Sequence, residues 1–171
     1  MKQTIIAVIC FLCVSSLYIQ AQKINHPSLL YTPQRIQQVK QRMQHEPKLQ
    51  EAWGDIKKTA NEALQKKDFN RLDYLSLAYL MTDNKEYADV IKEILLKAVE
   101  AESWGDVEMM ARIPAWRSQL GMAHKSFLSA VGYDAAYNVM PSSERKKIAE
   151  GLKRLAVEPA LGDWLLEPTR I

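Results

Sequence analysis

The stretch LDYLSLAYL at residues 72–80 decides the fold class of this chain. Its apolar side chains fall on more than one face of a helix, and a helix of that kind is usually buried. Elsewhere apolar residues recur at helical spacing, whereas the sequence has no sustained alternating β-branched run and no Asn-Gly or Asp-Gly hairpin turn. The sequence therefore predicts an all-α fold in which residues 72–80 form a buried helix.

Amphipathic helices are expected upstream and downstream of this segment. Two upstream helices are predicted to begin at Pro33, where Thr32 can cap the first turn, and at Pro47. Downstream, Asp83 and Glu86 have the spacing of a capping box in front of the next helix. These helices carry apolar residues on one face and polar residues on the other, which is typical of the surface of a globular domain.

The second half of the chain is expected to repeat this arrangement. Residues 103–114 are predicted to form a long connection, followed by a hydrophobic helix from about Ala115 to Val139 and an amphipathic helix after the turn at residues 141–144. Three residues are expected to break the helical pattern near the end: Pro159, Gly162 and Pro168. A buried helix followed by an amphipathic one thus occurs twice, which indicates stacked αα-hairpins, with an ordinary helical bundle as the alternative.

The first 21 residues have the layout of a secretory signal peptide. Lys2 supplies a short basic region, residues 5–14 are apolar, and Ala21 is a small residue suited to the position before the cleavage site. A membrane anchor is the main alternative, but the apolar run is short for roughly 30 Å of hydrocarbon. We therefore expect export to the periplasm or the exterior, and a mature domain of residues 22–171.

Removal of the signal peptide changes the cysteine content and the charge. Cys10 and Cys13 both lie in the apolar run, where the residues before them are too large for a lipid-attachment site. The mature chain then has no cysteine and must fold on its hydrophobic core alone. Loss of Lys2 lowers the formal net charge from +3 to +2. This balance gives no reason to expect a nucleic-acid partner, or a membrane partner after cleavage.

Three motifs resemble the heparinase II/III-like (alginate-lyase-like) polysaccharide lyases. The opening segment HPSLLYTP at residues 26–33 is similar to the HPRLLFTP with which that family's helical domain begins. Two later segments are also similar to the family: LAYLMT at residues 77–82 with Tyr87-Ala88, and GYDAAY at residues 132–137 with PSSER at residues 141–145. The resemblance covers nearly all of residues 26–171 and implies the N-terminal portion of an incomplete (α/α) toroid.

The resemblance implies an enzyme that cleaves uronic-acid polysaccharides by β-elimination. In that reaction the neutralised carboxylate acidifies the C5 proton, a Tyr or His removes the proton, and an acid assists the departing oxygen. The family's Asn-His pair, its catalytic Tyr and its β-sheet domain are expected beyond Ile171, so no catalytic residue is assigned to this chain. An apolar segment runs up to Ile171, and we therefore expect a truncated fragment of a lyase.

Five residues are expected to contact a uronic-acid polysaccharide or oligosaccharide: Arg112, Trp116, Arg117, Gln119 and His124. They lie around the end of the long connection, where the loops of a toroid gather. Trp116 offers an apolar face, Gln119 a donor and an acceptor, and either arginine a partner for a carboxylate. His124 is a candidate for proton transfer. The alternative is that Trp116 belongs to the core, the arginines are solvated and His124 is structural.

No metal site and no cofactor are expected, since no two histidines have metal-ligand spacing. Two other functions remain open. One is a glycoside hydrolase on the same toroid, of the unsaturated uronyl hydrolase type, which would need two carboxylates in one cleft. Asp134 and Asp163 are present, although a structural role is expected for Asp134. The other is a non-catalytic helical-repeat module that binds glycans.

Overall fold

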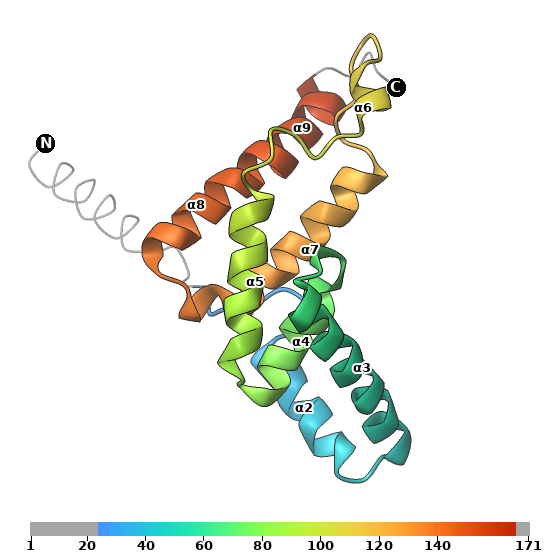
Figure 1. Cartoon of the computed structure of the whole chain (residues 1–171), viewed down its shortest axis with the longest axis vertical. Helices are drawn as coiled ribbons and strands as arrows, with labels where there is room; N and C mark the ends of the chain where they lie inside the picture. The colour runs from blue at the N-terminus through green and yellow to red at the C-terminus, as the bar shows by residue number, and fades with distance from the viewer. Residues whose placement is uncertain (1–23, 167–171) are drawn as a thin grey trace, which may run out of the picture.

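A computed structural model describes residues 24–166, and every regular element in this part of the chain is helical (Figure 1). The prediction of an all-α fold is therefore confirmed. The predicted signal peptide, the expected effect of Pro168 and the expected truncation all fall outside the described residues.

The helices are α2 (Pro33–Met43), α3 (Pro47–Lys66), α4 (Leu72–Thr82), α5 (Lys85–Ala98), α6 (Val107–Met110), α7 (Leu120–Ala136), α8 (Ser142–Leu152) and α9 (Glu158–Leu161). Three short turns join consecutive helices: the 3₁₀ turns η1 (Phe69–Arg71) and η2 (Tyr137–Val139), and the π-helical turn η3 (Lys153–Val157). A second π-helical turn, η4 (Gly162–Leu166), follows α9. Figure 1 shows an elongated body with α2 and α3 at one end, α8 and α9 forming a rod toward the other, and α4, α5 and α7 between them.

Helix α4 lies at the centre of the core, because it packs against α3, α5 and α7. Leu72, Leu75 and Ala78 have no solvent exposure, as expected for a helix that is apolar on several faces. Burial of each leucine stabilises the fold by about 1.5–3 kcal/mol. The close approach of α7 to this core depends on Gly132, since a Cβ there would lie 3.3 Å from side-chain atoms of Leu72 and Ile91.

The predicted starts of α2 and α3 are confirmed, and the Oγ1 atom of Thr32 accepts the N–H of Arg35 at 3.4 Å. The capping box predicted at Asp83 is wrong. Asn84 caps α5 instead, and its Oδ1 atom accepts the N–H of Glu86 at 3.1 Å. Asp83 ends the preceding helix with a left-handed backbone (φ 57°), a conformation that short polar side chains tolerate.

Helix α7 begins at Leu120, five residues later than predicted. The backbone N–H groups of Arg117 and Ser118 donate to Asp163 at 2.7 Å each, and this holds both residues outside the helix. Gln119 then has an extended backbone (φ −104°, ψ 175°) at the N-cap position. Residues 112–118 therefore belong to the connection between α6 and α7.

The prediction that Pro159 and Gly162 break the helical pattern is wrong, because the rod continues from α8 through η3, α9 and η4 (Figure 1). Pro159 lies in the first turn of α9, directly after the π-helical turn, where its missing N–H is tolerated. Gly162 is buried against the connection, and a Cβ there would lie 2.7 Å from Nη2 of Arg117. None of the helices between residues 24 and 166 combines the length and the hydropathy that crossing a bilayer requires.

Candidate functional site

The structure places Arg117, which is partly exposed, in an ion pair with the buried Asp163. The carboxylate of Asp163 accepts the Nε–H of Arg117 at 3.0 Å and the hydroxyl of Ser118 at 3.0 Å, in addition to the two backbone N–H groups. Nη2 of Arg117 lies 3.0 Å from Oδ1 of the same carboxylate and adds an ion-pair contact. Burial raises the pKa of Asp163, but the hydrogen bonds from Ser118 and Arg117 outweigh it and hold that pKa below its ordinary value. We refer to these three residues as the Asp163 clamp.

The other predicted sugar-binding residues are spread along the same region. Trp116 is 39% exposed and packs edge-to-face against Trp164, with ring centroids 6.3 Å apart. Arg112 and His124 are exposed, on the connection and on α7 respectively. The Nε2 atom of Gln119 is buried and has no hydrogen-bond partner among residues 24–166. Arg117 and Trp116 are thus adjacent to the rod, whereas the structure shows no common contact that unites all five residues.

A second buried aspartate, Asp134 on α7, holds the opening segment. Its carboxylate accepts the backbone N–H groups of Ser28 and Leu29 at 2.8 Å each, and the Nδ1 atom of His26 lies 2.5 Å away. The His26 ring also stacks on Tyr137, with centroids 3.8 Å apart. These contacts, which we call the Asp134 clamp, join the opening segment at residues 26–33 to the segment at residues 132–137. They agree with the structural role expected for Asp134.

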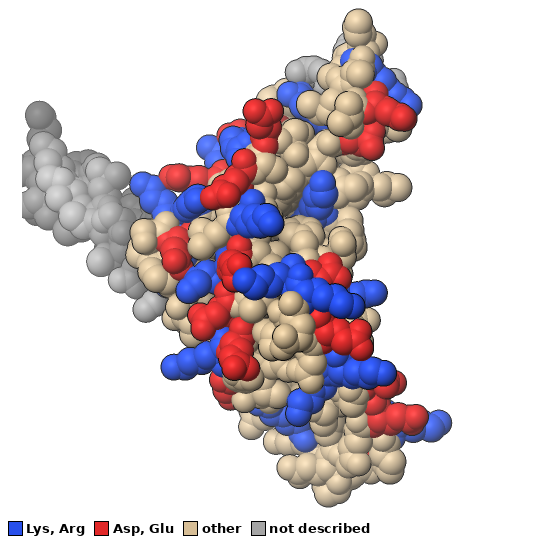
Figure 2. Space-filling view, viewed as in Figure 1, with Lys and Arg blue, Asp and Glu red and all other residues tan. Residues whose placement is uncertain are grey.

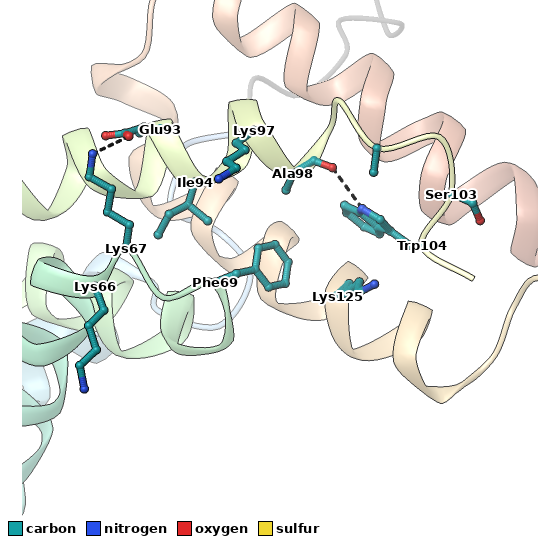
Figure 3. Close-up of a pocket in the computed structure, with 11 residues that line it drawn as sticks. Lys66, Lys67, Phe69, Glu93, Ile94, Lys97, Ala98, Ser103, Trp104 and Lys125 are labelled. Atoms are coloured by element: carbon teal, nitrogen blue, oxygen red, sulfur yellow. Dashed lines mark hydrogen bonds and ion pairs between the residues drawn. The ribbon is translucent and has the colours of Figure 1, made fainter. Parts of the chain in front are cut away.

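A pocket of about 540 Å³ opens elsewhere, between the C-terminal end of α3, helix α5, the connection after α5, and α7 (Figure 3). Phe69 and Trp104 form an aromatic wall, edge-to-face, with ring centroids 6.4 Å apart. The indole N–H of Trp104 donates to the carbonyl of Ala98 at 3.2 Å, and this side chain is only 4% exposed. The wall is therefore rigid, and Phe69 is its more exposed ring.

Four lysines and one acidic residue surround this aromatic wall: Lys66, Lys67, Lys97, Lys125 and Glu93. We call the site the lysine pocket. The Nζ atom of Lys67 lies 2.6 Å from Oε1 of Glu93, whereas within residues 24–166 the other three lysines have no acidic partner within 4.0 Å. In Figure 3, Lys97 and Lys125 flank the wall and Lys66 extends away from it. The local charge is thus positive.

This concentration of charge is local. Figure 2 shows acidic and basic side chains interspersed over the visible face of the molecule, as the small net charge implies. A pocket with several ammonium groups beside an aromatic ring suits an anionic ligand that also has an apolar face. Lysine carries a flexible point charge, so these residues can follow anionic groups at different positions on a ligand.

The backbone around Lys67 explains how the pocket forms. Lys67 ends α3 in a left-handed conformation (φ 49°), and its N–H donates to the carbonyl of Ala63. This turns the chain into η1, where Asp68 caps the turn by accepting the N–H of Asn70 at 2.9 Å. Phe69 then faces α5 instead of continuing α3, which brings it to Trp104.

The lysine pocket was not predicted from the sequence. Its lining comes from five segments, namely the end of α3, η1, α5, the connection after α5, and α7, and each lysine taken alone resembles an ordinary solvated surface residue. The one local signal is the Lys66-Lys67 pair at the end of an amphipathic helix, separated from Phe69 by Asp68 alone. None of the five residues predicted to bind sugar lines this pocket.

Each of the two buried aspartates, Asp134 and Asp163, accepts several hydrogen bonds from the chain itself, and the hydrolase function stays a prediction. Within residues 24–166 no group of three or more His, Cys, Asp or Glu side chains is placed to hold a metal ion. Comparisons with protein-family models, with curated proteins and with solved structures find no match to this chain.

Proposed function

We propose that this chain is the helical N-terminal part of an exported polysaccharide lyase, and that its lysine pocket binds uronic-acid-containing saccharides. The observation that carries the proposal is the pairing of unneutralised lysines, Lys97 and Lys125, with the Phe69–Trp104 wall. A uronate presents a carboxylate on a sugar ring whose C–H face is apolar, so both parts of the pocket have a counterpart in the ligand.

The proposal includes the finer architecture of an incomplete toroid built from stacked αα-hairpins. The packing of α4 against α5 and of α7 against α8 supports two hairpins, and the contacts of α4 with α7 and of α5 with α8 support their stacking. The link between the opening segment and α7 through Asp134 supports the same proposal, because it joins two of the motifs on which the resemblance rests.

In this proposal the chain binds and positions the polysaccharide, and β-elimination is performed by groups that are not assigned to it. A non-catalytic glycan-binding module is the second candidate, and the same pocket supports it. The lyase and the binding module are distinguished by what happens to the polysaccharide when it is incubated with the protein that the gene encodes. Lyase action on a uronate polymer creates an unsaturated sugar with ultraviolet absorbance, whereas a binding module leaves the polymer intact.

Binding is tested by calorimetry of the whole chain with an alginate-derived tetrasaccharide, and with uncharged cellotetraose as the comparison. We expect Lys97→Gln and Lys125→Gln each to weaken binding of the uronate about three- to tenfold at low salt, since each removes a charge-assisted contact. Added salt should reduce the difference, because exposed charges are screened.

Lys57→Gln is the matched control, because Lys57 is exposed on α3 outside the pocket and its loss changes the net charge equally. We expect this variant to bind the tetrasaccharide as the wild type does. Equal affinity of the wild type for cellotetraose, or equal weakening by all three substitutions, would contradict the proposed pocket.

A further inference from the structure

Glu93 is the one acidic residue among those that line the lysine pocket. It extends from α5 and its Oε1 atom lies 2.6 Å from Nζ of Lys67, which belongs to the end of α3 (Figure 3). The carboxylate therefore occupies the place beside this ammonium group that an anionic ligand would take. Lys97 and Lys125, on the other sides of the wall, have no such neighbour among the described residues.

The Lys67–Glu93 pair is weak enough to be displaced. The two side chains are 53% and 55% exposed, and an ion pair of this exposure contributes only about 0–1 kcal/mol. Both residues remain hydrated when the pair opens, so neither is left as a buried charge. A ligand anion that reaches Lys67 can therefore replace Glu93 at a small cost.

Glu93 also acts on ligands that do not reach Lys67. Its negative charge lies in the same pocket and repels any carboxylate that Lys97 or Lys125 holds. Glu93 thus opposes an anionic ligand in two ways. It occupies the ammonium group of Lys67, and it repels the carboxylate of the ligand.

We propose that Glu93 is an internal counter-ion that competes with the anionic group of the saccharide for Lys67, and so determines how strongly the pocket binds acidic ligands. This inference rests on the proposed function of the pocket. Glu93 contacts Lys67, so its competition with the ligand acts through Lys67, in addition to the general repulsion described above. Its effect is to make the pocket favour ligands whose charge is high enough to displace it.

The experiment measures the affinity of the alginate-derived tetrasaccharide for four forms of the whole chain: wild type, E93Q, K67Q and the double variant. In E93Q, Lys67 loses its competitor, and we expect affinity to rise about two- to fivefold at low salt. In the K67Q background the same E93Q substitution should raise affinity less, because no ammonium group is released there. A double-mutant cycle of this kind isolates the coupling between the two residues.

E100Q is the matched control for E93Q. Glu100 forms a comparable exposed pair with Lys147, at 3.1 Å, and does not line the pocket. We expect E100Q to leave the affinity of the tetrasaccharide unchanged, although it alters the net charge as E93Q does.

Each outcome gives a different answer. An equal gain from E93Q with and without Lys67 would overturn the competition and leave only general repulsion. No gain from E93Q, in a protein whose binding still depends on Lys97 and Lys125, would overturn this inference while the proposed function stands. Failure of the wild type to bind the tetrasaccharide would overturn both.

Discussion

The two clamps use the same chemistry near opposite ends of helix α7. Asp134 and Asp163 are each 3% exposed, and each accepts two backbone N–H groups from a segment that lies far away in the sequence. They differ in the third partner, which is the imidazole of His26 in one case and the guanidinium of Arg117 in the other. They also differ in what they hold, since Asp134 fixes the opening segment and Asp163 fixes an internal connection.

This difference predicts whether the loss of a clamp destabilises the whole fold or only the segment that the clamp holds. The connection held by Asp163 leads directly into the core helix α7 and cannot detach without disturbing it, whereas a segment that precedes the first described helix can detach by itself. Removal of Asp163 should therefore affect global unfolding, and removal of Asp134 should affect local opening.

The largest effect is expected for Asp163→Ala. This substitution leaves the guanidinium of Arg117 and two backbone N–H groups without their acceptor, and we expect it to lower the free energy of unfolding by about 2–4 kcal/mol. Urea denaturation at neutral pH measures the change. A loss below about 1 kcal/mol would show that water replaces the carboxylate at little cost, and that the connection is not fixed by the clamp.

A smaller effect on global stability, about 1–2 kcal/mol, is expected for Asp134→Ala. The stronger result should be local: the amide protons of Ser28 and Leu29 should exchange with solvent much faster, because their acceptor is gone. Asp55→Ala, at an exposed position of α3, is the control and should change stability by no more than about 0.5 kcal/mol. Equal losses of stability in Asp134→Ala and Asp163→Ala, together with equal amide exchange rates of Ser28 and Leu29 in the two variants, would contradict the proposed contrast between the clamps.

The smallest effect is expected for the stability contribution of Asp163 at acid pH. The pKa of Asp163 is lower in the folded protein than its ordinary value, so the stability it confers is fully present above the pKa of the unfolded chain. That contribution is lost as the pH falls through the lower, folded-state pKa. We therefore expect the stability difference between the wild type and Asp163→Asn to be constant near neutral pH and to shrink below about pH 4. A difference that grew on acidification would contradict this sign.

Much of the helical arrangement follows from the sequence because it depends on local patterns. The apolar faces of residues 72–80, the cap at Thr32 and the start at Pro47 are all properties of a few neighbouring residues, and the structure confirms them. The start of α7 and the continuation of the rod past Pro159 are different. They depend on a contact between Arg117 and Asp163, 46 residues apart, and on a π-helical turn that no single residue specifies.

The lysine pocket lay beyond local reasoning for the same reason. Lys67, Lys97 and Lys125 lie 30 and 28 residues apart in the sequence, and only the packing of α3, α5 and α7 gathers them around Phe69 and Trp104. The residues predicted to bind sugar lie instead in one short part of the sequence, residues 112–119 with the nearby His124, because neighbouring polar and aromatic residues can be recognised without a fold. Those residues remain predictions for sugar binding.

The left-handed backbone of Lys67 places stability and ligand recognition in conflict at one position. Glycine adopts that conformation without the steric penalty of about 1–2 kcal/mol that a residue with a Cβ incurs. Selection for thermal tolerance alone would therefore favour Lys67→Gly, and the more stable protein would lack one of the cations of its pocket. A library screened for both heat resistance and saccharide capture should separate into two populations at this residue, a signature of a stability–activity trade-off.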